Sequence, residues 1–364
     1  MELSSPVVTV IIPMRNEEDR IARCLDSILA NDFPHDRLEI LVVDGRSTDG
    51  SRQIVGNYAA RCPLIHILEN RDRIVPQGLN LGIREARGDI IMIMGAHCEY
   101  PRNYISTCVR ELDRTHADVV GGVLNTRPGS HTLVARAVAL VTQHLFGVGG
   151  SAFRTRKSGG FVDTVPYGAY RRNVFERVGL FNKKLARNQD FEFNARVRGA
   201  GGKLFLASEL EINYYNVPTF TRFASQAFRN GLWLSRMWMT SPSSFRVRHA
   251  IPLAFVSVLL ASAILGTFIV LAGQLSMVVV GAYVAAAATS TFQICRREGL
   301  KLFFLLIAMF FTLHVGYGIG TAAGLFVSGA TATKRAVRLR FRPVAVAAFH
   351  KPSSSAETPA RFGS

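Results

Sequence analysis

The chain has 364 residues, 48% of them hydrophobic, and a formal net charge of +17 at pH 7. Its five cysteines stand singly, without a Cys-x-x-Cys pair, which argues against a zinc ribbon or a disulfide framework and favours a reducing compartment. The positive charge requires an anionic partner. Because basic residues gather around the apolar C-terminal third and no nucleic-acid-binding module is recognisable, lipid headgroups are expected rather than nucleic acid.

Residues 7–124 alternate short apolar runs with amphipathic stretches, which is the pattern of βαβ units around a parallel sheet. Apolar residues at 21, 25 and 28 predict a helix after the first run. The N-terminus lacks a basic region followed by an apolar stretch, so no cleaved signal peptide is expected and this domain should stay in the cytoplasm. The predicted strands cover residues 7–12, 38–43, 64–68, 89–94 and 118–123.

Residues 125–163 are rich in Gly, Ser, Thr and Arg and break this periodicity, so they predict a mobile loop over a site. The domain itself is expected to extend over residues 1–217. Aromatic and arginine residues then recur at helical spacing within residues 218–248, which predicts an amphipathic helix in the membrane interface, although an ordinary core helix would give the same pattern.

Residues 249–328 form the predicted transmembrane region, with apolar segments at about 250–271, 275–295 and 302–327. Residues 329–364 read as a basic tail that is expected to be disordered. Three simple spans starting from the cytoplasm would place this tail outside, against the positive-inside tendency. Alternatively, His314 and the glycines at 316, 318, 320 and 324 break the last segment into a re-entrant pair and return the tail to the cytoplasm.

Polar residues follow the first two predicted strands, where ligands bind in open parallel sheets. Pro13 ends the first strand and is followed by Asn16 and Glu17, although Asn16 could serve only as a helix cap. Asp44 ends the second strand, where its carboxylate can accept hydrogen bonds from a base or a ribose. The chain has neither GxGxxG after the first strand nor GxxxxGK[ST], which argues against dinucleotide oxidoreductases and P-loop enzymes.

Three motifs in order, VTVIIPMRNEE, EILVVDGRSTDGS and GLNLGIREARGDIIMI, resemble the nucleotide-binding half of glycosyltransferase family 2. The later runs FVDTVPYGAYRRNVFERVGLFNKKL, NQDFEFNARVRGAGGKL and HVGYGIG resemble the succinoglycan-biosynthesis ExoA group of that family. The resemblance implies an α/β fold of the GT-A type, Rossmann-like, with a mostly parallel sheet and flanking helices. The C-terminal transmembrane helices would follow this domain.

The resemblance also implies roles for individual residues. Asp190 would be the catalytic base, which an inverting transfer needs to take the proton of the acceptor hydroxyl, although a carboxylate there could serve only the start of a helix. The residues implied in donor binding are Pro13, Asn16 and Glu17 at the base and ribose, Asp44 at the uracil, and Asn80 near the diphosphate.

Two positions depart from the family pattern. Gly95 replaces the leading aspartate of the metal motif and leaves His97 as the candidate ligand, which suits Mn²⁺ better than Mg²⁺. Glu99 could substitute only if the chain bends there. A divalent cation is therefore in doubt, and restoring aspartate at Gly95 is expected to strengthen metal dependence. The second departure is Gln189, which replaces the acid that often precedes the base. Arginines at 15, 46, 71 and 73 are the alternative for neutralising the diphosphate.

The QxxRW motif of processive synthases is incomplete here, because Gln226 and Arg229 are present but the tryptophan is displaced to Trp233. This favours single addition over polymerisation, and it places Arg229 and Trp233 at the interface near a lipid diphosphate.

The expected function is an inverting hexosyltransferase at the bacterial inner membrane, multi-pass, with a cytoplasmic catalytic domain. It would transfer a hexose, with UDP-glucose as the donor that the resemblance implies, to a polyprenyl-diphosphate-linked acceptor in exopolysaccharide biosynthesis. The alternative is a non-catalytic component that binds nucleotide-sugar or glycan.

Overall fold

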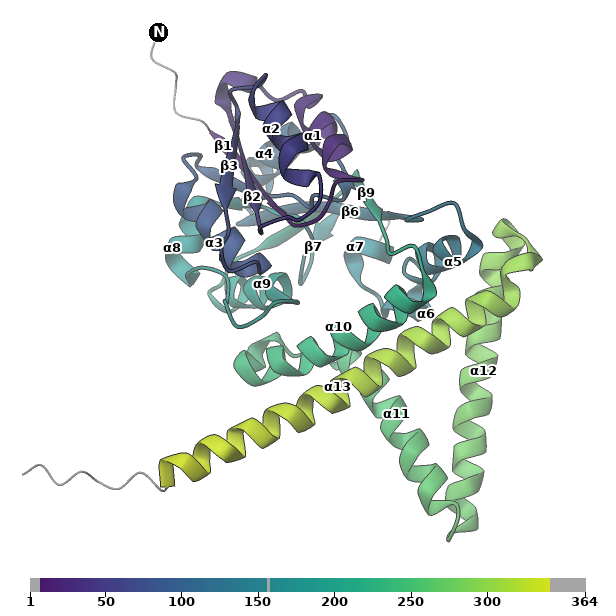
Figure 1. Cartoon of the computed structure of the whole chain (residues 1–364). Coiled ribbons are helices and arrows are strands. Elements are labelled where there is room, and N and C mark those ends of the chain that lie inside the picture. Colours follow the sequence, from purple (N-terminus) through teal and green to yellow (C-terminus); the bar gives the residue numbers. More distant parts are fainter. Residues whose placement is uncertain (1–6, 156–157, 341–364) are drawn as a thin grey trace, which may run out of the picture.

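The N-terminal part of the chain is built around a mixed β-sheet (Figure 1). The computed structural model describes residues 7–155 and 158–340, with side chains described as far as residue 327. The sheet order is β3-β2-β1-β4-β8-β6-β9-β5, with β7 paired to β9. The strands are β1 (Val8–Met14), β2 (Leu38–Asp44), β3 (Ile65–Glu69), β4 (Ile90–Ile93), β5 (Cys98–Glu99), β6 (Val119–Arg127), β7 (Gly160–Phe161), β8 (Ala169–Arg171) and β9 (Leu204–Tyr215).

All five predicted strands are present, and β1 to β4 form a parallel block. The short strand β8 then pairs antiparallel with both β4 and β6, so the second half of the sheet is mixed. Because two antiparallel steps restore the direction, β6 points the same way as β4. The carboxyl ends of β1, β2, β4 and β6 therefore lie at one edge of the sheet, where a ligand site is expected.

Helices pack against this sheet as the apolar spacing predicts. The predicted first helix is α1 (Ile21–Leu29), which buries Ile21, Leu25 and Ile28 together with Cys24. Helix α3 packs on β1 and β2, and α4 packs on β6 and β9. The other helices of the domain outside residues 125–163 are α2 (Ser51–Ala59), α3 (Val75–Glu85), α4 (Tyr104–Thr115), α8 (Arg172–Val178) and α9 (Gln189–Gly199).

The predicted loop at residues 125–163 is wrong for much of its length. Strand β6 continues to Arg127, and α5 (Leu133–Val141), α6 (Leu145–Val148) and α7 (Ala152–Thr155) follow. The apolar face of α5 is buried against Phe223 and Phe310 of the C-terminal helices. This segment therefore joins the sheet domain to the C-terminal helices, and its order comes from contacts remote in sequence.

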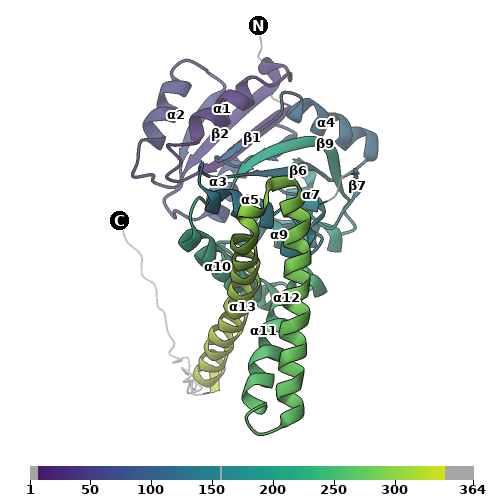
Figure 2. The same cartoon turned by 90° about the vertical axis from the view of Figure 1, so that its right-hand side faces the viewer.

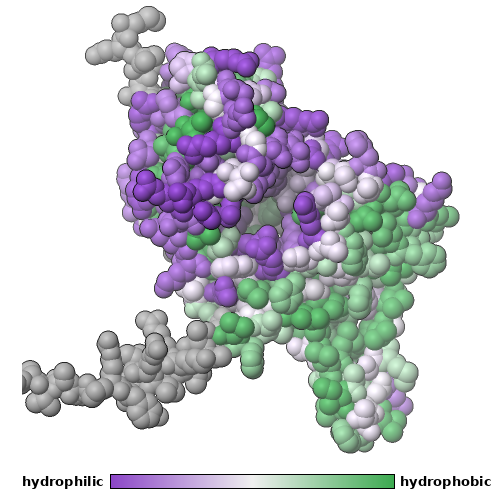
Figure 3. Space-filling model, viewed as in Figure 1, coloured by the Kyte–Doolittle hydropathy of each residue, from purple (hydrophilic) through white to green (hydrophobic). Residues whose placement is uncertain are grey.

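Four long helices complete the described chain. They are α10 (Phe220–Thr240), α11 (Val247–Leu265), α12 (Val270–Glu298) and α13 (Phe303–Arg340). Three segments, Val247–Leu265, Val270–Glu298 and Leu300–Val327, are long and apolar enough to cross a membrane. The first predicted span ends too late, since α11 stops at Leu265. Helices α11 and α12 form a hairpin that projects away from the sheet domain, and its surface is hydrophobic where the domain above is hydrophilic (Figures 1, 2 and 3).

Ion pairs connect both open ends of this hairpin to the sheet domain and its adjoining helix α5. At the start of α11, Arg248 Nη2 lies 2.6 Å from Asp163 Oδ2. At the end of α12, Glu298 Oε2 accepts a hydrogen bond of 3.1 Å from Arg136 Nε on α5. Both ends of the hairpin therefore lie on the side of the sheet domain.

Helix α13 is continuous, so the predicted re-entrant break is wrong. Its glycines form a contact surface for α10, which runs alongside α13 (Figure 1). A Cβ at Gly320 would lie 2.0 Å from the carbonyl oxygen of Phe228, and one at Gly231 of α10 would lie 2.0 Å from that of Tyr317. Small residues let two helix backbones approach this closely. Residues 329–340 continue the helix instead of forming a disordered tail, and residues 341–364 lie outside the described residues.

Candidate active site

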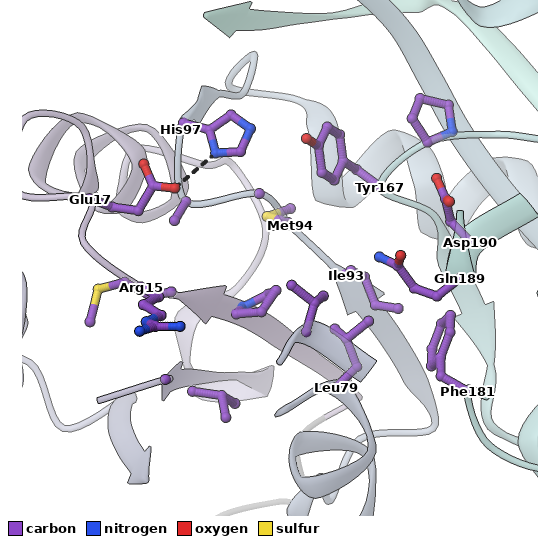
Figure 4. A pocket seen from close by; sticks show the side chains of 18 of the residues that line it. Arg15, Glu17, Leu79, Ile93, Met94, His97, Tyr167, Phe181, Gln189 and Asp190 are labelled. Atoms are coloured by element: carbon purple, nitrogen blue, oxygen red, sulfur yellow. Dashed lines mark hydrogen bonds and ion pairs between the residues drawn. The ribbon is translucent and has the colours of Figure 1, made fainter. Parts of the chain in front are cut away.

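A cavity of about 410 Å³ opens at the carboxyl edge of the sheet. One wall comes from the segments after β1 and β4, and the other comes from β6, α7 and the start of α9. Figure 4 shows Glu17 and His97 on one side and Gln189 and Asp190 on the opposite side, with the ring of Tyr167 between them. The predicted residues Pro13, Glu17, His97 and Asp190 all line this cavity.

Asn16 and Asp44 do not line the cavity, and both hold the loop after β2. Asn16 has a positive φ of 56°, which asparagine tolerates better than most residues, and its Oδ1 accepts a 2.8 Å hydrogen bond from the Thr48 N–H. Asp44 is fully buried, and its Oδ1 accepts hydrogen bonds of 3.0 and 2.7 Å from the backbone N–H and hydroxyl of Ser47. Arg52 lies 3.2 Å from the other oxygen of Asp44. Both side chains therefore fix the loop after β2, and their predicted contacts with a base or ribose stay predictions.

Asn80 is also buried, on α3, and both ends of its amide bind the backbone of Phe181. Its Nδ2 donates to the carbonyl oxygen at 2.8 Å, and its Oδ1 accepts from the N–H at 2.9 Å. Phe181 in turn lines the cavity. In this structure Asn80 positions the cavity wall, and its predicted contact with a diphosphate stays a prediction.

His97 lies within reach of a second potential metal ligand. Its Nδ1 is 3.1 Å from Glu17 Oε1, and its ring packs edge-on against Tyr214 at 5.3 Å between centroids. Among the described residues, no group of three or more His, Cys, Asp or Glu side chains could hold a metal ion. A cation at Glu17 and His97 would therefore have to take its remaining ligands from a bound diphosphate and water.

The place of the missing aspartate is filled by an aromatic ring. A Cβ added at Gly95 would lie 2.7 Å from Cε1 of Tyr167 and 2.9 Å from its hydroxyl oxygen. The backbone of Tyr167 is held by a 2.9 Å hydrogen bond from the Tyr104 hydroxyl to its carbonyl oxygen. Gly95 and Tyr167 thus form a matched pair that leaves no room for a carboxylate at position 95.

Asp190 stands in the first turn of α9, after Asn188, whose φ is 59°. Burial raises the pKa of the Asp190 carboxyl, while backbone N–H groups of Phe191 and Asp190 and the charge of Arg154 act in the opposite direction. A raised pKa makes this carboxylate a better proton acceptor than a solvated aspartate.

Arg154 is a further cation of the cavity that could bind a diphosphate. The sequence predicted only a loop for this part of the chain. Arg154 lies on α7 and lines the cavity. Its Nη1 donates to Thr126 Oγ1 at 2.9 Å, and its guanidinium lies 5.5 Å from the ring centroid of Tyr214. Burial lowers its pKa, and no carboxylate of the described residues forms an ion pair with it. An arginine stays protonated even so, which leaves its charge free for an anion.

The four arginines that sequence offered for this role are placed differently. Arg15 and Arg73 line the cavity, whereas Arg46 pairs with Glu69 at 3.0 Å and Arg71 is exposed outside the lining. The only local hint of Arg154 was an arginine after a phenylalanine in a Gly-rich segment.

The two predicted interface residues on α10 point to different surroundings. Arg229 lines a second cavity, of about 330 Å³. Trp233 instead packs beneath Arg236, whose guanidinium carbon lies 4.5 Å from the indole centroid, and against Leu185, Leu234 and Met237.

A mixed sheet whose carboxyl edge carries a cavity lined by Glu17, His97 and Asp190, beside helices apolar enough to cross a membrane, fits a transferase of the GT-A type. Comparison with known proteins supports this class. The model of Glycosyl transferase family 2 matches residues 9–179, so the chain carries a domain of this family and is a glycosyltransferase. The predicted family and fold are confirmed.

The chain is similar to a dolichyl N-acetyl-alpha-D-glucosaminyl phosphate 3-beta-D-2,3-diacetamido-2,3-dideoxy-beta-D-glucuronosyltransferase of Methanococcus voltae, with 27% identity over 89% of this chain and 98% of the relative. It is 25% identical to the succinoglycan biosynthesis protein ExoA of Rhizobium meliloti, over 78% of this chain and 84% of ExoA. Among solved structures, the mannosyltransferase PcManGT of Pyrobaculum calidifontis, in complex with GDP-Man and Mn²⁺, aligns with a TM-score of 0.57 at 21% identity. The alignment covers 88% of this chain and 87% of that structure. This structural likeness supports the fold.

Proposed function

We propose that this chain is an inverting hexosyltransferase of bacterial exopolysaccharide assembly that transfers a hexose from a UDP-sugar, with UDP-glucose the expected donor, to a polyprenyl-diphosphate-linked sugar. The observation that carries the proposal is the position of Asp190, which shares one cavity with the donor-side residues Pro13, Glu17 and His97. The name of the Methanococcus relative, which specifies a dolichyl-phosphate-linked sugar, supports a lipid-linked acceptor.

The chemistry follows from this arrangement. The acceptor hydroxyl forms a bond to the anomeric carbon from the side of Asp190, and the bond between that carbon and the diphosphate oxygen breaks. The proton of the hydroxyl passes to the Asp190 carboxylate, and the nucleoside diphosphate leaves with the electron pair. A single carboxylate suffices, because the diphosphate needs no proton to leave when positive charge balances it.

Arg154 supplies this positive charge from inside the cavity, and Arg15 and Arg73 add to it from the donor side. A divalent cation held by Glu17 and His97, Mn²⁺ rather than Mg²⁺ because of the imidazole, would provide further charge stabilisation. Since Tyr167 fills the space beside Gly95, most of the neutralisation is assigned to arginine.

The distribution of charge on the hairpin supports a cytoplasmic position for the catalytic domain of this proposed bacterial inner-membrane enzyme. Its ends beside that domain carry Arg246, Arg248, Arg296 and Arg297, whereas the far turn at residues 266–269 has no charged residue. Positive charge is concentrated on the cytoplasmic side of membrane proteins. With α13 unbroken, a third span would place the C-terminal tail outside.

The decisive experiment is transfer of radiolabelled sugar from UDP-glucose into the lipid fraction by membranes that contain the full chain, compared with Asp190→Asn. Loss of the base should lower transfer by about 10²- to 10⁴-fold while UDP binding is retained. Asp36→Asn, an exposed position remote from the cavity lining, is the matched control and should keep full transfer. Transfer that survives Asp190→Asn at the control level would refute the proposed role of Asp190.

The pH profile provides a second test of the same residue. Because burial raises the pKa of Asp190, the base form disappears on acidification at a higher pH than for a solvated aspartate, and the rate should fall with it. The raised pKa also means that the ionised Asp190 carboxylate lowers the free energy of unfolding at pH values above its folded pKa. The melting temperature of Asp190→Asn at pH 7 should therefore be no lower than that of the parent.

The alternative function, a non-catalytic component that binds nucleotide-sugar or glycan, is favoured by Gly95 and Gln189. It predicts that the protein binds UDP but transfers sugar from no UDP-sugar. The variant Asp190→Asn should then bind UDP as the parent does.

A further inference from the structure

A second cavity on the membrane side of the catalytic domain is lined by three arginines. It lies between the segment before α9 and the first half of α10 and measures about 330 Å³. No acidic side chain lines it. We call it the arginine groove, and its lining residues are Arg187, Val217, Thr221, Arg222, Ser225, Gln226 and Arg229.

Within the described part of the chain, the arginines of the groove have no acidic partner. None of its arginines forms an ion pair with an acid among the described residues, in contrast to Arg177 or Arg196, which each do. The Arg187 side chain is fixed by a 2.9 Å hydrogen bond from its Nη1 to Asn230 Oδ1. Burial lowers its pKa, and the nearby charge of Arg229 lowers it further. Three arginines that line one groove without an acidic partner favour a site that is completed by an anion.

The arginine groove adjoins the active-site cavity. Arg187 stands three residues before Asp190 in the chain, and the Asn188 side chain between them donates to the Asn230 carbonyl oxygen of α10 at 3.4 Å. Gln226 of the groove lies close enough to Tyr214, a residue that lines the active-site cavity, to oppose the rise in pKa that burial causes in that tyrosine. An anion bound to Arg187 would therefore lie close to Asp190, the proposed base.

The groove is also close to the membrane helices. It is formed by the same helix, α10, that packs along α13 through Gly231 and Gly320. Phe220 and Phe228 of α10 are exposed beside it. A lipid could thus keep its chain in the bilayer while its charged head enters the groove.

We propose that the arginine groove binds the phosphate or diphosphate that joins the acceptor sugar to its lipid. This proposal rests on the proposed function and names the site that holds its acceptor. Arginine forks bind phosphate oxygens through paired hydrogen bonds, and two or three of them match the charge of a diphosphate. Bound phosphate at Arg187 and Arg229 places the first sugar toward Asp190, whereas a bulk phospholipid has no sugar to place there.

The test measures binding of a polyprenyl phosphate to the full-length protein in nonionic detergent, so that it does not depend on transfer. The variant Arg187→Gln/Arg229→Gln should lose affinity by about 10- to 100-fold, the equivalent of one or two charge-assisted hydrogen bonds. Arg296→Gln/Arg297→Gln removes the same charge from the last turn of α12 and should bind like the parent. If Arg187 is necessary for folding, the single variant Arg229→Glu at an exposed position replaces the double variant. It should also lose affinity for polyprenyl phosphate.

Micelles that contain phosphatidylglycerol form the second arm. Polyprenyl phosphate should bind the parent more tightly than phosphatidylglycerol does, and only its binding should depend on Arg187 and Arg229. The proposal would be overturned if Arg187→Gln/Arg229→Gln and Arg296→Gln/Arg297→Gln lost the same affinity, or if both lipids bound the parent equally. Either result would indicate general attraction to anionic membranes. Asp190→Asn should leave binding intact, so a failure of the proposed transfer reaction and a failure of this site give different results.

Discussion

The two walls of the active-site cavity differ in how their polar side chains are satisfied. Just behind the lining of what we call the donor wall, Asn16, Asp44 and Asn80 form hydrogen bonds with neighbouring protein groups and fix the segments that border the cavity. On the side of Asp190, which we call the acceptor wall, Arg154 lines the active-site cavity and Arg187 lines the adjoining arginine groove. Both have hydrogen bonds to neutral groups only and no ion pair within the described residues. The first wall is thus organised before any ligand arrives, whereas the second keeps charge available for ligands.

This contrast predicts that a substitution on the acceptor wall impairs catalysis more than stability, and that the reverse holds on the donor wall. The largest expected effect belongs to Arg154, because it lines the cavity and forms no ion pair among the described residues. Arg154→Gln should lower kcat by about 10²- to 10³-fold, the usual cost of removing one preorganised donor from a developing negative charge. Steady-state transfer kinetics measure this loss.

Arg71→Gln is the matched control for Arg154, since Arg71 is exposed and outside the cavity lining. If arginine carries the neutralisation, transfer by the parent should also persist in EDTA. Complete loss in EDTA together with normal kcat for Arg154→Gln would return the role to a cation at Glu17 and His97.

The second effect concerns the Gly95 and Tyr167 pair. Gly95→Asp forces a Cβ to within 2.7 Å of the Tyr167 ring, so it should lower the free energy of unfolding by about 3 kcal/mol instead of simply creating a metal site. Adding Tyr167→Ala makes room and should recover stability. The double variant is then the one in which dependence on Mn²⁺ should increase.

Thermal melting and metal titration of transfer follow this series. Gly56→Asp on α2 is the control, because nothing lies within 4 Å of a Cβ there. A Gly95→Asp protein as stable as this control would mean that the Tyr167 ring moves aside readily.

Sequence patterns predicted the local part of this fold well. The strands β1 to β4 and the helix α1 follow from apolar periodicity, because each segment's own residues decide which face is buried. The three apolar segments likewise predicted α11, α12 and α13. The motifs of the family resemblance singled out Pro13, Glu17, His97 and Asp190, and the structure brings these four residues together in one cavity.

What the sequence did not predict depends on contacts remote in the chain. Helix α5 gains its buried face from α13, which lies far ahead in sequence, so its Gly-rich flanks suggested a loop. Glycines of α13 suggested a break, yet they fit against the backbone of α10. Tyr167 occupies the space beside Gly95 across 72 positions of sequence, and no local pattern reports such a pairing.

The smallest expected effect tests the donor wall through Asn80. Asn80→Ala removes both hydrogen bonds to the Phe181 backbone and leaves its buried N–H and carbonyl unsatisfied, so it should cost about 1–2 kcal/mol of unfolding free energy. Its kcat should stay close to that of the parent at temperatures where the protein is folded. Asn57→Ala, at an exposed position of α2, controls for the substitution itself. If Asn80 instead contacts the donor diphosphate directly, the KM for the UDP-sugar will rise strongly with little change in melting temperature. That result would mean that the donor wall also keeps polar groups for its ligand, and the contrast between the two walls would then be one of degree.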